Sequence, residues 1–159
     1  MEEEQKRRFE QSYDTYGAMV YRLAMVYLGR QADAEDVTQE VFYRLLRKAP
    51  AFPDQEREKR WLFQVTANLC KDQLKGFWRK RTAALEAEFP EERPEDRAVL
   101  EAVLALPEIY KGPIHLHYYE GYSVAETAEI LGLSPSAVKM RLMRGRERLK
   151  LELGMEELV

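Results

Sequence analysis

The chain has 159 residues, a formal net charge of −3, 45% hydrophobic and 33% charged residues, and a single cysteine. This composition is typical of a folded, mostly helical protein, and no apolar run is long enough to span a membrane. One cysteine excludes an internal disulfide, and the opening Met-Glu-Glu-Glu does not resemble a secretory signal. We therefore expect a cytoplasmic protein in which any binding to nucleic acid depends on local basic segments.

Three long helices are predicted in the first half of the chain. They cover residues 3–28, 33–48 and 58–79, and Gly29 closes the first. Their apolar residues recur at helical spacing and are expected to pack inward. These residues are Phe9, Tyr13, Tyr16, Val20, Leu23 and Tyr27, then Val37, Val41, Leu45 and Leu46, then Trp61, Leu62, Val65, Leu69 and Leu74.

The second predicted helix begins with an acidic face. Asp33, Asp36 and Glu40 are three and four residues apart, so they share one side of the helix beside Gln39. Such a face could pair with a basic partner, although carboxylates near a helix N-terminus are also favoured by the helix dipole. Catalysis is not predicted here, because no histidine or glycine-rich loop accompanies the carboxylates.

The third predicted helix interleaves aromatic, amide and basic residues over positions 59–81. Unstacked bases bind aromatic rings and phosphates bind cations, so this composition favours contact with single-stranded nucleic acid. Trp61 and Phe63 also fit a helical core, and Cys70 fits a buried, reduced packing residue.

The acidic, proline-containing stretch after the third helix has no core face, and we interpret it as a linker. The predicted domains are therefore residues 1–81 and 96–154, joined by residues 82–95. Shorter helices are predicted over 96–104 and 113–119, with Pro113 opening the second of these. His115 and His117 point in different directions on a helix, so neither is interpreted as a metal ligand, and no cofactor is predicted.

Residues 120–146 form a predicted helix-turn-helix. Ser123 can cap a short helix, and Gly132 supplies the left-handed turn that ends it. Ser134 and Pro135 then open a second helix as N-cap and first helical residue.

The second helix of this motif has two different sides. Val138, Leu142 and Leu149 form an apolar stripe, whereas basic residues and methionines occupy the remaining surface. One packed side and one basic side are what a DNA-recognition helix requires. A solvated helical hairpin held by surface ion pairs is the alternative interpretation.

Taken in this order, the motifs resemble the extracytoplasmic-function sigma factors, the compact group of the bacterial sigma-70 family. Residues 33–42 resemble the polymerase-binding part of region 2, residues 61–75 its promoter-melting part, and residues 106–149 region 4. The resemblance implies an all-α fold with a three- to four-helix bundle and a winged-helix-like helix-turn-helix domain. It implies a non-enzymatic factor that binds core RNA polymerase and directs promoter-specific transcription initiation.

The same resemblance implies three sets of binding residues. Those that would bind the clamp helices of the largest polymerase subunit are Asp33, Asp36, Gln39, Glu40 and Phe42. Those that would bind the melted minus 10 element are Phe52, Asp54, Arg57, Arg60, Trp61, Asn68, Lys71 and Lys75, with a flipped base accepted by the loop of residues 51–57. Those that would bind the minus 35 element are Ser136, Lys139, Met140, Arg141, Met143, Arg144, Arg146 and Arg148.

The implied partners are promoter DNA, core RNA polymerase through its clamp helices and its beta flap, and an anti-sigma factor that could be membrane-bound. The free protein is expected to be a monomer in the bacterial cytoplasm. The competing interpretation is a stand-alone helix-turn-helix repressor or activator. It would explain residues 123–150 and predict palindromic half-sites, but it leaves the acidic face and the aromatic-basic helix without a role.

Overall fold

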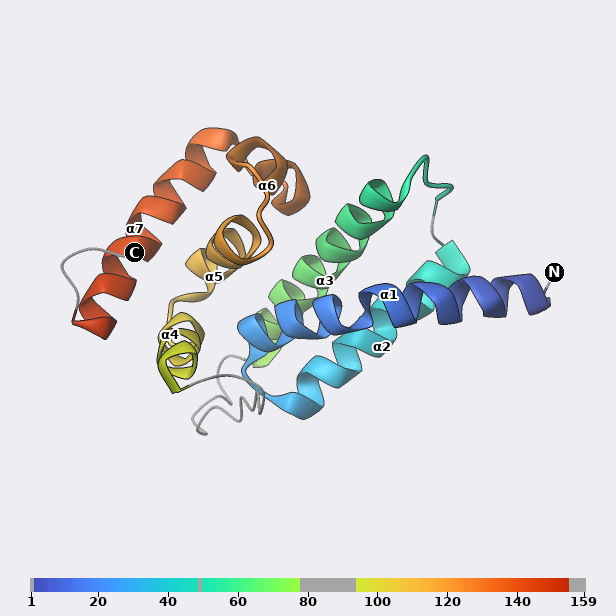
Figure 1. Ribbon diagram of the computed structural model, residues 1–159, viewed down its shortest axis with the longest axis horizontal. Coiled ribbons are helices and arrows are strands. Elements are labelled where there is room, and N and C mark those ends of the chain that lie inside the picture. Colours follow the sequence, from blue (N-terminus) through green and yellow to red (C-terminus); the bar gives the residue numbers. More distant parts are fainter. Residues whose placement is uncertain (1, 49, 78–93, 155–159) are drawn as a thin grey trace. The chain divides into compact units, whose positions relative to one another are not determined.

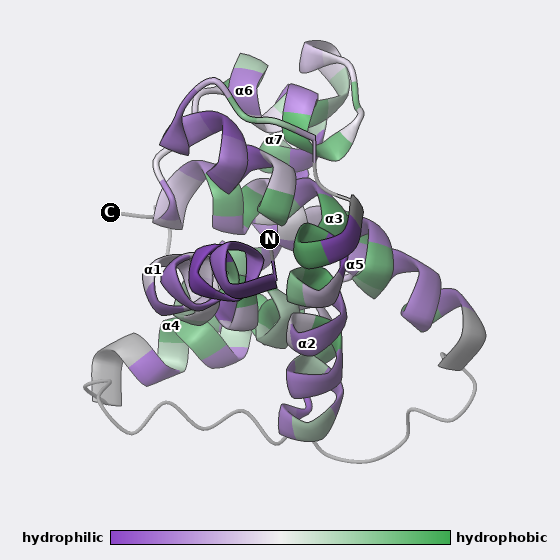
Figure 2. Ribbon diagram, turned by 90° about the vertical axis from the view of Figure 1, so that its right-hand side faces the viewer, coloured by the Kyte–Doolittle hydropathy of each residue, from purple (hydrophilic) through white to green (hydrophobic). Residues whose placement is uncertain are grey.

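The computed structural model describes residues 2–48, 50–77 and 94–154, and all regular elements in these segments are helical (Figure 1). The chain divides between Ala83 and Ala84 into two compact units, called here the N-terminal and C-terminal domains. Hydrophilic and hydrophobic residues alternate along the ribbons of the long helices (Figure 2). This alternation is expected of amphipathic helices that bury one side. The all-α prediction is confirmed.

The N-terminal domain is a bundle of α1 (Glu2–Leu28), α2 (Gln31–Lys48) and α3 (Gln55–Phe77), each packed against the other two. Its core includes the fully enclosed side chains of Leu23, Tyr27, Val41, Phe42 and Phe63. Gly29 ends α1 with a φ of 71°, a left-handed conformation that glycine adopts without strain.

Two helices begin earlier than predicted. α2 begins at Gln31 because the Ala34 N–H donates to the Arg30 carbonyl at 2.9 Å directly after the turn at Gly29. α3 begins at Gln55, where the Asp54 carboxylate accepts a hydrogen bond from the Arg57 N–H at 2.8 Å. An aspartate in this position caps a helix, so the predicted start at residue 58 missed the first turn.

The buried side of α3 also differs from the predicted one. It is formed by Leu62, Phe63, Thr66, Ala67 and Cys70, whereas Trp61, Val65, Leu69 and Leu74 are only partly buried. Thr66 can be enclosed because its hydroxyl donates to the Leu62 carbonyl at 2.6 Å, and a satisfied hydroxyl costs little to bury. Two further residues predicted inward, Tyr13 and Leu46, are 45% and 41% exposed. Burial of Cys70 agrees with its prediction.

The C-terminal domain contains α4 (Pro94–Leu104), α5 (Glu108–Ile114), a π-helical turn called η2 (His115–Tyr119), α6 (Val124–Leu131) and α7 (Pro135–Leu153). α5, α6 and α4 all pack against α7. The core of this domain includes Leu106 of the α4–α5 connection and Tyr110, Ile114, Val138, Leu142 and Leu149 of the helices. The three residues predicted as the apolar stripe of α7 are therefore buried, as expected.

Gly145 marks the close approach of α7 to α5. A Cβ atom at this position would lie 3.0 Å from the Ile114 Cγ1 and 3.3 Å from the Tyr110 Cβ, so there is almost no room for a side chain. Glycine lowers helix propensity, but here it allows the backbone of α7 to rest directly on α5.

Pro113 does not open a helix, which corrects the prediction. α5 begins five residues earlier at Glu108, and Pro113 lies inside it, buried with Tyr110 and Ile114. The packing of these side chains outweighs the hydrogen bond that a proline nitrogen cannot make. The helix then widens into η2, where the Glu120 N–H donates to the His115 carbonyl at 3.0 Å, five residues back.

The turn of the helix-turn-helix agrees with its prediction residue by residue. Ser123 caps α6 by accepting from the Glu126 N–H at 3.1 Å, and the Glu126 carboxylate accepts from the Ser123 N–H at 2.9 Å. This reciprocal pair is a capping box. Gly132 ends α6 with a φ of 68°, and the Ser134 hydroxyl accepts from the Ala137 N–H at 3.1 Å to open α7.

Candidate nucleic-acid and protein interfaces

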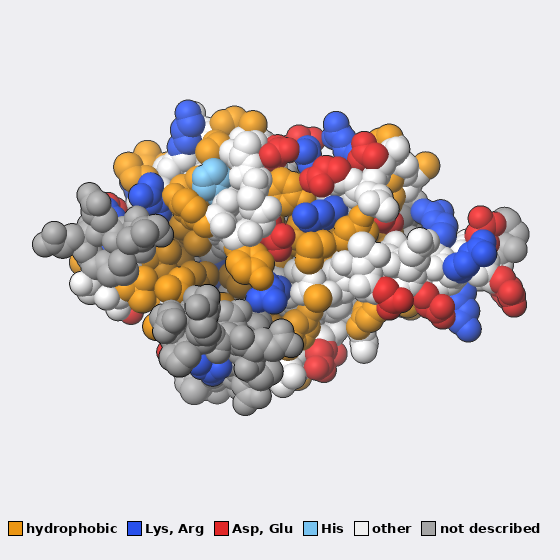
Figure 3. All heavy atoms as spheres, in the orientation of Figure 1, with side chains coloured by type: hydrophobic (Ala, Val, Ile, Leu, Met, Phe, Trp, Pro, Cys, Tyr) orange, Lys and Arg blue, Asp and Glu red, His pale blue; other side chains and the backbone are white. Residues whose placement is uncertain are grey.

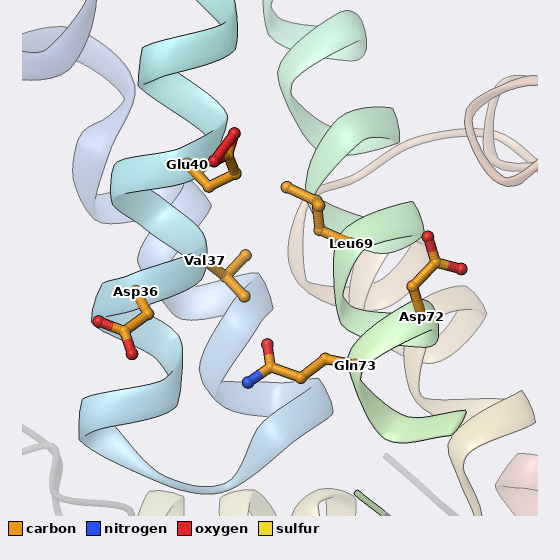
Figure 4. A pocket seen from close by; sticks show the side chains of 6 residues that line it. All are labelled: Asp36, Val37, Glu40, Leu69, Asp72 and Gln73. Atoms are coloured by element: carbon orange, nitrogen blue, oxygen red, sulfur yellow. The ribbon is translucent and has the colours of Figure 1, made fainter. Parts of the chain in front are cut away.

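The acidic residues of α2 form a ridge on its surface between two grooves; some are exposed and others partly buried, and they are Asp33, Glu35, Asp36 and Glu40. On one side, a groove of about 360 Å³ between α2 and α3 is lined by Asp36 and Glu40 together with Asp72. Figure 4 shows Val37 and Leu69 pointing toward each other across its floor. This groove combines a hydrophobic floor with carboxylate edges, which suits a partner that has basic side chains on an apolar stem.

The other side of the ridge faces α1. A groove of about 520 Å³ there is lined by Gln39 and Glu35 of α2 and by Tyr13, Asp14 and Tyr21 of α1. The pKa of Tyr21 is raised by burial and by the nearby Glu35 carboxylate, while a hydrogen bond with Gln31 acts in the opposite direction. Of the predicted polymerase-binding residues, Asp36 and Glu40 thus line one groove and Gln39 lines the other, whereas Asp33 lines neither.

Phe42 has a different place from the other members of its predicted set. Its side chain is 0% exposed and lies edge-on to Phe9 and Tyr13, with ring centroids 6.2 and 5.1 Å away. The Phe42 side chain thus packs in the core on the inner side of α2. Asp36 and Gln39 are exposed, and Asp33 and Glu40 are partly buried. Glu40 also pairs with Arg44 at 3.3 Å, a solvent-exposed contact that contributes little to stability.

The loop between α2 and α3 brings two predicted minus 10 residues together. The rings of Phe52 and Trp61 meet edge to face with centroids 5.7 Å apart, and both are partly buried. Asp54 is exposed, with its carboxylate oriented by the hydrogen bond from the Arg57 N–H. An aromatic surface next to an oriented carboxylate can stack on a base and accept a hydrogen bond from its edge.

The remaining predicted minus 10 residues lie along α3. Asn68 and Lys75 are exposed and Lys71 is partly buried. Arg60 is partly buried and pairs with Glu56 at 3.4 Å. These polar and basic groups continue from Trp61 toward the end of the helix, so they can follow a nucleic-acid backbone.

Charged residues of both signs intermingle elsewhere on the domain. The exposed start of α1, at the right of Figure 3, carries acidic and basic side chains next to one another. The small net charge of the whole chain therefore hides local differences, because α1 begins with charges of both signs whereas the α2 ridge is acidic.

The predicted minus 35 residues occupy the outer surface of α7. Ser136, Lys139 and Arg144 are exposed, and Met140 and Met143 are 45% and 56% exposed. Cations flanked by apolar groups can bind phosphates and the methyl group of thymine.

The other three arginines of this set lie to the side of that surface or farther along the helix. Arg141 is partly buried, whereas Arg146 and Arg148 are exposed. The Arg146 guanidinium lies 5.9 Å from the ring centroid of Tyr118, and that of Arg148 lies 6.0 Å from the ring centroid of Tyr110. Such cation–π contacts orient the guanidinium groups while leaving them able to bind an anion.

Two features beside these surfaces were missed by sequence reasoning. Tyr118 and Tyr119 of η2 are 52% and 58% exposed, although they follow a buried segment. His115 lies buried with its Nε2 atom 3.5 Å from the Glu120 carboxylate and its ring stacked on Tyr119. Only the exposed tyrosine pair could have been suspected, from its position just before the helix-turn-helix.

Neither a metal site nor a membrane-spanning helix occurs in the part of the chain that the structure describes. Within it, no group of three histidine, cysteine or carboxylate side chains is arranged to hold a metal ion. Among these same residues, no helix is both long enough and apolar enough to cross a membrane.

Comparison with protein families gives two matches that together cover most of the chain. Sigma-70 region 2 matches residues 12–82, and Sigma-70, region 4 matches residues 96–149. The N-terminal bundle and the helix-turn-helix domain thus correspond to different regions of the same family.

Curated relatives carry the same family name. The ECF RNA polymerase sigma factor BldN of Streptomyces coelicolor is 35% identical over 144 residues, covering 82% of this chain and 54% of BldN. The factor SigM of Mycobacterium tuberculosis is 30% identical over 154 residues, covering 92% of this chain and 77% of SigM. The factor SigW of Bacillus subtilis is 29% identical over 167 residues, covering 91% of this chain and 88% of SigW.

Solved structures show the same fold. The sigma factor RpoE of Bartonella quintana, in complex with the anti-sigma factor NepR, has a TM-score of 0.79 at 20% identity, covering 95% of this chain and 99% of RpoE. CnrH, in complex with the cytosolic domain of CnrY, has a TM-score of 0.66 at 27% identity, covering 94% of this chain and 89% of CnrH.

Proposed function

This chain belongs to the sigma-70 family, as an extracytoplasmic-function RNA polymerase sigma factor, and we propose how its surfaces carry out that function. Such a factor binds core RNA polymerase and directs it to specific promoters. The observation that carries the proposal is the presence, in one chain, of an acidic α2 ridge and a capped helix-turn-helix with a basic outer surface. A stand-alone repressor or activator would need only the second.

The α2 ridge is the proposed binding site for the clamp helices of the largest polymerase subunit. Asp36 and Glu40 would pair with basic residues of those helices, and the hydrophobic floor at Val37 and Leu69 would receive their apolar stems. Charge complementarity speeds association and selects the partner, so an acidic ridge suits a protein that competes for a shared enzyme.

The loop and α3 form the proposed minus 10 site. Phe52 and Trp61 would stack on bases of the melted strand, while Asn68, Lys71 and Lys75 would line its path. Removing a base from the stack costs a few kcal/mol, and stacking on an aromatic ring contributes about 1–3 kcal/mol per base. The aromatic pair is therefore suited to hold the opened strand.

The outer surface of α7 is the proposed minus 35 site. Lys139, Met140, Met143 and Arg144 would face the major groove, and Arg146 and Arg148 would hold phosphates beside it. The β flap of the polymerase would contact this domain and set its distance from the N-terminal domain on the promoter.

An anti-sigma factor is proposed as the regulator of this chain. Support comes from the similar fold of RpoE, which is bound by the anti-sigma factor NepR in its solved structure. We also propose that the chain acts in the bacterial cytoplasm and catalyses no step itself, since RNA synthesis is the chemistry of the polymerase. A regulator copurified from uninduced cells should block transcription when it is added back in equimolar amount.

Transcript mapping tests the main proposal. The purified chain is mixed with core RNA polymerase and fragmented genomic DNA of the source bacterium, and the RNA 5′ ends are sequenced. We expect discrete start sites that share upstream elements and vanish when the chain is omitted. A reaction with a different sigma factor controls for active polymerase. If that control succeeds and the chain yields no new starts, the sigma-factor role is contradicted.

A further inference from the structure

A polar groove lies where α1 passes the beginning of α3, and no predicted site includes its α1 side. Its volume is about 320 Å³. One wall contains Phe52 and Asp54 of the loop, and the other contains Arg8, Gln11 and Thr15 of α1. The loop residues and the α1 residues are about forty positions apart in the chain, so only the folded bundle brings them together.

Two hydrogen bonds hold these walls at a fixed spacing. The Ser12 hydroxyl donates to the Glu58 carboxylate at 3.0 Å, and the Tyr16 hydroxyl donates to the Gln55 carbonyl at 3.3 Å. Both α1 side chains are buried and lie in the groove wall. Because they tie α1 to the first turn of α3, the width of the groove is a property of the fold and does not depend on exposed side chains.

The chemistry of the walls suits a planar ligand with polar edges. Phe52 offers an aromatic ring, which meets the Trp61 ring edge to face with centroids 5.7 Å apart. Gln11 is exposed, and its amide can donate and accept a hydrogen bond at the same time, as the edge of a base requires. Thr15 is exposed one turn farther along α1, where its hydroxyl donates to the Gln11 carbonyl at 2.8 Å and can still accept a hydrogen bond.

A second groove continues from the first. It has a volume of about 200 Å³, shares Arg8, Ser12 and Glu58 with the first, and is also lined by Arg47 of α2. Arg8 and Arg47 are two cations against the single Glu58 carboxylate, so the lining of this second groove has a net positive charge. A strand with one base in the first groove could therefore place its next phosphate near Arg8.

We propose that α1 completes the pocket for an unstacked promoter base, and that Gln11 determines which base it accepts. This inference rests on the proposed minus 10 role of the loop. It adds that the base is held between Phe52 and α1, with Gln11 contacting the base edge and Arg8 the adjoining phosphate. Specificity at this promoter position therefore depends on two segments that are distant in sequence.

Transcription from a randomised promoter library tests the inference. Holoenzyme is assembled from core polymerase and the full chain, and a mapped promoter is used in which each minus 10 position is varied. Gln11→Ala and Phe52→Ala should both relax base preference at the same single position. The ratio of the most to the least favoured base there should fall roughly tenfold, as expected for loss of one base-edge contact.

Two more variants sharpen the result. Gln11→Glu removes the donor of the amide and leaves only acceptors, so it should move the preference toward bases whose exposed edge donates, such as guanine or cytosine, rather than abolish it. Glu10→Ala is the matched control, because Glu10 is exposed on α1 next to Gln11 but does not line the groove. It should leave every base preference unchanged.

The outcomes separate this inference from the function on which it rests. If Phe52→Ala relaxes one position and Gln11→Ala relaxes none, α1 does not contact the base, while the role of the loop stands. If the two variants relax different positions, the shared pocket is wrong. If neither changes any preference, the minus 10 role of the loop fails as well. Uniformly reduced transcription with weaker core binding in Gln11→Ala would mean a structural effect and would also overturn the inference.

Discussion

The two domains form their binding surfaces in different ways. In the N-terminal domain, the α2 ridge and the pocket beside Phe52 both border grooves between helices, so their shapes depend on how α1, α2 and α3 pack. In the C-terminal domain, the candidate surface is the outer side of one helix, positioned by caps and a glycine turn only a few residues away. Substitutions should therefore mix binding with packing in the first domain and separate them in the second.

Charge reversal on the α2 ridge should have the largest effect on function. Asp36→Arg places a cation on the ridge that is proposed to meet basic clamp helices, and repulsion there should weaken core binding by about 30-fold or more. Binding can be measured by titrating labelled chain with core polymerase. Glu10→Arg makes the same charge change on the exposed part of α1 and should bind nearly as well as the unmodified chain. Unimpaired binding by Asp36→Arg would remove the ridge from the interface.

Removal of two cations from α7 should have the next largest effect. Lys139→Ala combined with Arg144→Ala should weaken binding of the holoenzyme to the minus 35 element about tenfold and reduce the salt dependence of that binding. Both side chains are exposed, so thermal stability should change little. Lys150→Ala is the comparison, because Lys150 is paired with Glu147 at 3.3 Å and is outside the predicted set. Unchanged minus 35 recognition by the double variant would contradict the role of the surface.

Two glycine-to-alanine substitutions should change stability in opposite directions. Gly145→Ala should destabilise the C-terminal domain by about 1 kcal/mol, because the added methyl meets the enclosed Ile114 and overpacking outweighs the gain in helix propensity. Gly17→Ala should stabilise the N-terminal domain by about 0.5–1 kcal/mol, since its methyl would lie at an ordinary 3.6 Å from the Tyr13 ring. Urea unfolding followed by circular dichroism measures both. Equal effects of the two variants would show that α5 can yield to the new methyl.

The smallest expected effect concerns alkaline stability of the N-terminal domain. Burial, assisted by Glu58 and Glu56, raises the pKa of Tyr16 above its ordinary value of 10.0. The unfolded chain therefore releases this proton first, so the stabilising contribution is present below pH 10 and is lost as the pH rises through the folded-state pKa. Above pH 10 the free energy of unfolding should therefore fall as the pH rises. In Tyr16→Phe it should fall less steeply over this range. This variant should also lose about 1 kcal/mol at neutral pH with the hydrogen bond to Gln55. An unchanged alkaline slope would assign the decline to other groups.

The features that were predicted well depend on neighbours in sequence. Ser123, Gly132, Ser134 and Pro135 act on the turn in which they occur, so their roles could be predicted without knowledge of the rest of the fold. The family resemblance, now supported by the family matches, added the general function to a two-domain plan that the acidic, proline-containing stretch had already indicated.

The features that were missed depend on packing between helices. The buried side of α3 includes the small residues Thr66 and Ala67, whereas helical spacing alone favoured the larger Trp61. Pro113 was predicted to start a helix because proline is favoured at the first helical position. In the folded domain it lies inside α5, where it is buried. The burial of Phe42 and the α1 wall of the base groove likewise follow only from the assembled bundle.

The close contact at Gly145 has a consequence for protein engineering. The backbone of α7 rests on α5 at this point. The buried Gly145, on the inner side of α7, therefore determines how the axis of α7 lies relative to α5. Residues 139, 140, 143 and 144 lie on the outer side and take no part in that support. These four outer residues can therefore be exchanged without altering the support of α7, provided that Gly145 and its neighbours on α5 are retained.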